Sequence, residues 1–110
     1  MIVLKKVNSR LVEKNIQPGQ TEEFFSLDLA KYEAFDWNIK FLIPSDGQRG
    51  ITKISSLYNE GSIDSTMYAF LGKRFNAGVD IFVSADDYCK LTITNNESST
   101  MRCAVKLKTF

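Results

Sequence analysis

Residues 88–109, YCKLTITNNESSTMRCAVKLKT, decide the fold. Apolar and polar side chains alternate from Tyr88 to Thr94 and again from Met101 to Thr109, and the polar segment 95–99 separates the two runs. An apolar side chain at every second position is typical of a strand that buries one face. We therefore predict an antiparallel hairpin with one apolar face, which the rest of the chain covers, and one polar, mostly basic face.

Upstream of this stretch, further alternating segments are separated by turn signals. They cover residues 21–29, 37–43, 51–58, 66–71 and 79–83. The segment that starts at Trp37 carries the bulkiest apolar set and is predicted to be the central strand. The alternation slips between Ile51 and Ile54, which predicts a β-bulge there. Pro18-Gly19 fits the two central positions of a type II turn, and residues 30–35 are predicted to form one helical turn.

The number and spacing of these segments indicate the fold class. About eight strands, at intervals of roughly 8–15 residues, favour an all-β sandwich or barrel. No helix longer than a turn or two is expected, which excludes parallel βαβ crossovers. We expect one domain over residues 1–110, a two-layer antiparallel β-sandwich with a jelly roll as one admissible arrangement. Residues 1–14 are charged and irregular, which is typical of an edge strand or an extended arm.

The composition is that of a soluble globular protein. Of 110 residues, 44% are apolar and 25% are charged, and the net charge is +1. This balance gives no reason to expect nucleic acid or an anionic membrane as a partner. The first apolar run is too short for a signal peptide, and no segment approaches the ~20 apolar residues of a membrane span. We therefore expect a protein that is made and folded in a cytoplasm.

Two cysteines, Cys89 and Cys103, lie on the apolar phase of the two final runs. In the predicted hairpin they could face each other across the ladder. In a reducing compartment we interpret them as small core residues rather than as a disulfide. The sequence leaves open whether they are ever oxidised.

The residues that usually carry chemistry are missing or poorly placed. The chain has no histidine, which removes the commonest general base and the usual catalytic zinc sites. No phosphate-binding glycine motif and no zinc knuckle occur. Neighbours Glu22 and Glu23 point to opposite faces of a strand, and Asp86-Asp87 fits a turn. We therefore predict that the protein is not an enzyme and has no metal and no cofactor.

Basic residues gather on the polar face of the last run. Arg102, Lys106 and Lys108 share this face. They form either a stripe that binds phosphate or a partner, or a solvated face whose charges protect an edge strand, and we favour the second interpretation.

Aromatic residues make up 12% of the chain, and several fall on the phase opposite their strand's core set. The segment from Met67 to Leu71 is apolar on both phases, and a thin two-layer domain cannot bury both. Three interpretations stay open, namely cover by the core or a loop, contact with another subunit, and stacking against a sugar ring. The candidate contact residues are Met67, Tyr68, Phe70, Phe82 and Tyr58.

Four motifs resemble a known group of proteins. They are NIQPGQT (15–21), LDLAKY (27–32), ISSLYNEG (54–61) and LTITNN (91–96). Together they look like small β-sandwich virion proteins of tailed bacteriophages, which serve as tail, fibre-attachment, neck or head-decoration components. The resemblance runs over most of the chain and rests on turns and strand phases, so it transfers no catalytic or ligand residue.

The resemblance implies a non-enzymatic structural protein of the virion, assembled in the host cytoplasm. Its partners would be other copies of itself and other virion proteins, held by repeated symmetric contacts. Two alternatives remain. One is a carbohydrate-binding sandwich that uses exposed aromatic residues, and the other is a regulatory module that binds one host protein.

Overall fold

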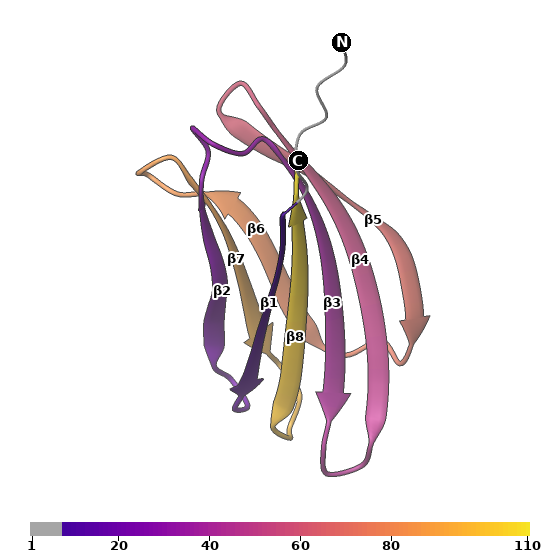
Figure 1. Cartoon of the computed structure of the whole chain (residues 1–110). Helices are drawn as coiled ribbons and strands as arrows, with labels where there is room; N and C mark the ends of the chain where they lie inside the picture. Colours follow the sequence, from indigo (N-terminus) through magenta and orange to yellow (C-terminus); the bar gives the residue numbers. More distant parts are fainter. Residues whose placement is uncertain (1–7) are drawn as a thin grey trace.

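The computed structural model describes residues 8–110, which form eight β-strands in two antiparallel sheets and no helix (Figure 1). The predicted all-β sandwich is therefore confirmed. The part of the predicted N-terminal arm that precedes Asn8 lies outside the described residues. The strands are β1 (Asn8–Ile16), β2 (Thr21–Asp28), β3 (Ala34–Ile43), β4 (Gln48–Asn59), β5 (Ser62–Gly72), β6 (Ala77–Val83), β7 (Tyr88–Asn95) and β8 (Met101–Thr109).

The two sheets differ in size. The large sheet has five strands in the order β1-β8-β3-β4-β5, and the small sheet has three in the order β2-β7-β6. β3 occupies the middle of the large sheet, as predicted for the segment that carries Trp37. The order stops short of a full jelly roll, because β3, β4 and β5 form a meander within one sheet.

The predicted hairpin of β7 and β8 is wrong. β7 pairs with β2 and β6 in the small sheet, whereas β8 pairs with β1 and β3 in the large sheet. The loop between them carries the chain from one layer to the other, and the two apolar faces meet across the core. Alternation identifies the buried face of a strand but not its hydrogen-bonded neighbour, so the sequence could not separate these two arrangements.

The same arrangement keeps the cysteines apart. Both thiols are free and buried. Cys89 lies near the start of β7 and Cys103 near the start of β8, so they are offset by about 13 Å along the strands in addition to about 10 Å between the layers. A disulfide needs Cα atoms within about 7 Å, and the predicted approach across a ladder does not occur.

The core lies between the sheets and centres on Trp37. The indole of Trp37 packs against Phe35 with ring centroids 5.7 Å apart and against Phe25 at 5.8 Å. Alternate residues of β3, β7 and β8 fill the rest, as their period of two predicts. The fully buried side chains include Ile39, Leu91, Ile93, Met101, Val105 and Leu107.

Three local predictions can be compared with the structure. The helical turn predicted over residues 30–35 is wrong, because residues 29–31 form a turn and β3 already begins at Ala34. β4 alternates regularly, with Ile54 on the core side and Ile51 on the outer side, so the predicted bulge in this strand is wrong. The register shifts instead in β5, where Tyr68 is the extra residue between the partners of Ile54 and Lys53. The turn at Pro18-Gly19 is confirmed, because Gly19 has φ +78° and the Gln20 N–H donates to the Gln17 carbonyl at 3.0 Å.

The unequal sheets leave one side of the sandwich open. On one side the edge strands β1 and β2 lie next to each other, and on the other side the edge strands are β5 and β6. We call these the charged side and the open side. The small sheet does not extend over β5, which lies beyond it in Figure 1 and is exposed along most of its length.

Candidate protein-contact site

β5 presents large apolar side chains to solvent on both of its faces. The exposed fractions are 49% for Met67, 53% for Tyr68, 40% for Phe70 and 65% for Leu71. We call these four residues the apolar edge. A single exposed apolar residue is ordinary, whereas a contiguous group on an edge strand is typical of a contact surface.

The bulge at Tyr68 determines which way these side chains point. Met67 pairs with Ile54 and Phe70 with Thr52, so both lie on the core-side face, although three positions in sequence separate them. Leu71 pairs with Ile51 on the outer face. The Tyr68 hydroxyl donates to Asp36 Oδ1 at 2.9 Å across the outer face, and this hydrogen bond to a carboxylate raises the pKa of Tyr68.

A hollow of about 290 Å³ opens between the sheets on the open side. Met67 and Phe70 line it from β5, and Phe75 and Val79 line it from the other side. Phe75 is fixed against Phe41 with ring centroids 5.8 Å apart. Most of the lining is apolar, but Thr52 and Arg74 also line the hollow, and the Arg74 guanidinium lies 5.5 Å from the centre of the Phe70 ring.

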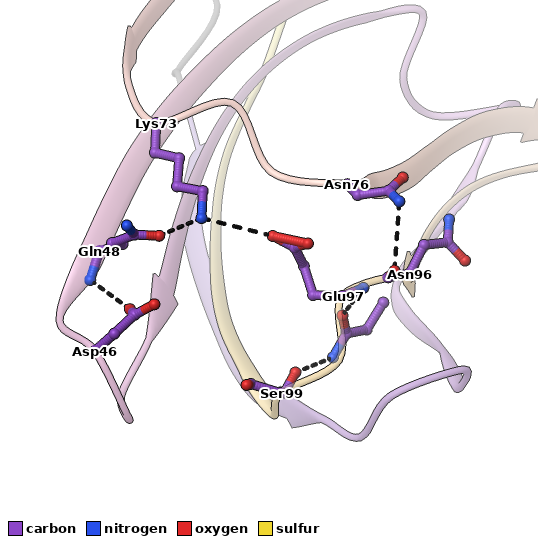
Figure 2. A network of polar contacts seen from close by, with 8 residues as sticks. Asp46, Gln48, Lys73, Asn76, Asn96, Glu97 and Ser99 are labelled. Carbon is purple, nitrogen blue, oxygen red and sulfur yellow. Dashed lines mark hydrogen bonds and ion pairs between the residues drawn. The ribbon is translucent and has the colours of Figure 1, made fainter.

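Polar contacts hold one end of the open side in place (Figure 2). Lys73, immediately after β5, donates to Gln48 Oε1 and lies 4.0 Å from the carboxylate of Glu97. Further along the same connection, the Asn96 N–H donates to the Asn76 carbonyl at 3.0 Å. These contacts join the β5–β6 connection to β4 and to the β7–β8 loop, so the hollow has a defined shape without a partner.

The structure brings three of the five predicted contact residues together. Met67, Tyr68 and Phe70 belong to the apolar edge. Phe82 lies on the outer face of the small sheet opposite Lys90, and Tyr58 is half-buried against the core, so neither joins them.

A period-two pattern places Leu71 and Met67 on the same face of the strand, and Leu71 was not among the predicted contact residues. The bulge between them moves Leu71 to the outer face. A β-bulge has no reliable sequence signal in such a short apolar run, so only the apolar character of both phases could have drawn attention to Leu71.

The edges on the charged side are different in character. β1 carries Arg10, Glu13 and Lys14, and β2 carries Glu22 and Glu23. The ammonium of Lys14 reaches from one sheet to the other, donating to the Glu23 carbonyl at 2.6 Å and lying 3.8 Å from the Glu22 carboxylate. Charges of this kind discourage strand addition. On β5, by contrast, no charged residue occurs from Ser65 to Gly72.

The predicted basic stripe lies on the outer face of the large sheet. β8 lies between β1 and β3, so the interpretation of these lysines as protection for an edge strand is wrong. The register places Lys106 beside Asn38, which has Lys53 on its other side. A shallow hollow of about 440 Å³ on the same face is lined by Glu13, Lys40, Phe41, Leu42, Arg49, Gly50, Ile51, Arg102 and Ala104.

The acidic residues form no constellation in the described part of the chain. Within residues 8–110 no group of three or more metal-ligating side chains converges. Glu22 is directed at Lys14, and Glu23 lies 3.3 Å from Lys90, so the two carboxylates diverge as predicted. Asp86 accepts a hydrogen bond from the Ser84 hydroxyl, which lowers the pKa of Asp86, as expected of a turn residue. The same residues contain no helix that is long and apolar enough to cross a membrane.

Comparisons with known proteins give little further information. No protein-family model matches the chain, and no curated protein matches it. Among solved structures, the tailspike protein of Acinetobacter phage vB_ApiP_P1 is similar, with 10% sequence identity and a TM-score of 0.44. The match covers all of this chain and 23% of the tailspike chain. At this level the likeness establishes neither a shared fold nor a shared function.

Proposed function

We propose that this chain is a non-enzymatic structural protein of a bacteriophage virion, and that it acts through protein–protein contacts made by β5. Its partners would be copies of itself and other virion proteins. The observation that carries the proposal is the apolar edge, four large apolar side chains on a stretch of edge strand, residues 65–72, that has no charged residue.

Two further observations support a role in assembly. The chain lacks histidine, so any active site would have to work without the commonest general base. The sequence motifs that resemble small virion sandwiches are turns and strand phases, and the turn at Pro18-Gly19 has the conformation that its motif predicts. Attachment to a tail, neck, fibre or capsid lattice is consistent with all of these features.

The test compares two leucines of equal exposure. Leu71 on β5 and Leu11 on β1 are both 65% exposed. We expect Leu71→Lys to weaken association with virion proteins or with itself by roughly tenfold or more, as at an interface hot spot, and Leu11→Lys to leave it unchanged. Light scattering and binding to purified capsid and tail proteins provide the measurement. A wild-type chain that neither associates nor binds at its highest soluble concentration would contradict the proposal.

A second candidate function is glycan binding by the outer face of the large sheet. Half-exposed Tyr68 adjoins a small hollow that Lys53, Lys106 and Lys108 also line. In that hollow, the buried Oδ1 atom of Asn38 has no hydrogen-bond partner among residues 8–110. A tyrosine ring beside one unsatisfied amide oxygen is suited to stacking on a sugar while the oxygen accepts from a sugar hydroxyl.

A glycan array with matched variants tests this candidate. Tyr68→Ala should abolish any binding, and Tyr58→Ala, which removes a half-buried tyrosine elsewhere, should not. An array without hits, or hits that survive Tyr68→Ala, would exclude it.

A further inference from the structure

The charges at the two ends of β5 are of opposite sign. Asp64 is the only charged residue of the strand and lies near its start, whereas Lys73 and Arg74 follow its end. A two-fold axis between two antiparallel copies of β5 would bring each Asp64 beside the cations of the other copy. A parallel arrangement would place like charges together, which is destabilising.

The bulge makes one antiparallel register self-complementary. Along β4, Ile54, Lys53 and Thr52 pair with Met67, Ala69 and Phe70 respectively. A two-fold axis at Ala69 therefore places Met67 of one copy opposite Phe70 of the other, with both side chains on the core-side face. Without the extra residue Tyr68, these two side chains would lie on opposite faces and could not pair.

The same register also matches the outer face and the charges. Thr66 comes opposite Leu71 of the second copy. Positions can be counted along β4 from Lys53, the partner of Ala69. Asp64 pairs with Leu57, four residues to one side of Lys53, and the Lys73 N–H donates at 2.9 Å to the carbonyl of Arg49, four residues to the other side. Asp64 therefore comes opposite Lys73 of the second copy.

We propose that two copies of this chain associate edge to edge through antiparallel β5 strands, with Met67 of each copy opposite Phe70 of the other. This inference rests on the proposed function, because it names the partner of the same strand. The two large sheets become one continuous sheet, and the facing Met67 and Phe70 side chains cover the mouths of both hollows, which these side chains line. The opposite edges, β1 and β2, stay free because charged residues are spread along them, which disfavours the addition of another strand.

Cysteine cross-linking tests the register directly. Protein with Thr66→Cys mixed with protein with Leu71→Cys should form a disulfide-linked dimer, because directly opposite Cα atoms in an antiparallel pair lie about 4.5–5.5 Å apart. Thr66→Cys alone should not cross-link, since the two Thr66 positions would be about 13 Å apart along the strands. Native Cys89 and Cys103 are buried and do not interfere.

A charge exchange provides the second test. Asp64→Lys and Lys73→Asp, which reverse the two charges that the register places opposite each other, should each raise the dimer dissociation constant by roughly three- to tenfold, as expected for exposed ion pairs. The double variant should recover wild-type affinity. Equilibrium sedimentation of each variant at low salt gives the dissociation constants.

The outcomes separate this inference from the proposed function. Cross-linking of the mixed pair together with recovery in the double variant would support the β5 dimer. A monomeric wild type, or a dimer that cross-links at Leu11→Cys and not through β5, would overturn it. If a monomeric chain binds a purified virion protein and Leu71→Lys abolishes that binding, the proposed function stands and the β5 dimer fails.

Discussion

A serine hydroxyl satisfies the indole of the largest core side chain. Trp37 Nε1 donates to Ser56 Oγ at 3.0 Å inside the core, and Ser56 in turn shares a hydrogen bond of 2.7 Å with Ser65 Oγ on β5. The chain of contacts runs from the central strand to the edge strand. It anchors β5 although most of that strand is exposed.

Removing this hydroxyl should be costly. We expect Ser56→Ala to lower the free energy of unfolding by about 1–3 kcal/mol, because a buried indole N–H loses its acceptor. Urea denaturation followed by Trp37 fluorescence measures the change. The neighbouring Ser55→Ala, on the exposed face, should stay within about 0.5 kcal/mol of wild type. Equal effects for both variants would show that the Trp37 contact does not matter.

The two buried thiols should make stability fall at alkaline pH. Burial raises the pKa of Cys89 to about 11 and that of Cys103 to about 12, from an ordinary value of 9.0. Above pH 9.0 the thiols of the unfolded chain lose their protons, whereas the folded chain keeps them until the pH reaches the raised pKa values. The contribution of the two neutral buried thiols to folding stability is therefore complete below pH 9.0 and is lost as the pH rises towards 12. Urea midpoints of wild type and the Cys89→Ala/Cys103→Ala variant should converge above pH 9.0.

The reactivity of the two thiols provides a second test of their burial. A thiol reagent at pH 8 should modify neither cysteine in the native protein and both in urea, because the thiolate is the reactive form. Fast modification of the native protein would contradict the burial of Cys89 and Cys103.

At the scale of the elements, one asparagine fixes the passage between the sheets. Asn95 is completely buried at the end of β7. Its Nδ2 donates to the Ile16 carbonyl at 2.8 Å and to the Ser99 carbonyl at 2.9 Å, and its Oδ1 accepts from the Glu97 N–H at 2.8 Å. The side chain therefore ties the β7–β8 loop to the end of β1.

Asn95→Asp hardly changes the size of the side chain but should still strongly destabilise the fold. The new carboxylate cannot donate to the two carbonyls, and its charge would be buried, so we expect a loss of about 3 kcal/mol or more in unfolding free energy. The adjacent Asn96→Asp, on an exposed residue, should change stability by less than about 0.5 kcal/mol. Thermal unfolding monitored by circular dichroism compares the pair. A mild effect of Asn95→Asp would mean that the loop is held by other contacts.

The predictable part of this fold is the burial phase of its strands. The alternation of Trp37, Ile39 and Phe41 predicted both the buried face of β3 and its central position. The same alternation could not show that β7 and β8 lie in different sheets. The assignment of β7 and β8 to different sheets depends on the β7–β8 loop, which buried Asn95 holds in place. The sequence cannot distinguish Asn95 from the exposed Asn96 that follows it.

The candidate site was predictable to a similar extent. The doubly apolar segment indicated that Met67, Tyr68 and Phe70 could not all be buried. Phe82 and Tyr58 were grouped with them by residue type, although the register places them on other surfaces. Which side of the sandwich is open depends on the unequal strand numbers of the two sheets, and no local pattern encodes that difference.

For the whole molecule, the last strand completes the large sheet. β8 lies between β1 and β3, and it supplies Met101, Val105 and Leu107 to the core. We expect a chain that ends at Thr100 to be unfolded, because β1 would lose the one strand that pairs with it among residues 8–110, and the core would lose one wall. Circular dichroism and the emission of Trp37 would detect this. A cooperative unfolding transition in the shortened chain would show that the remaining strands suffice.

The pairing of β1 with β8 also places the two ends of the described chain together. Asn8 is opposite Thr109, and the Phe110 N–H donates to the Ala34 carbonyl at 3.0 Å beside them. In a chain that starts at Asn8, a short linker could therefore join Asn8 to Phe110, and new ends could be cut at the Pro18-Gly19 turn without removing a strand from either sheet. Circular permutants of this kind would also let a reporter domain be attached at either end of the sandwich.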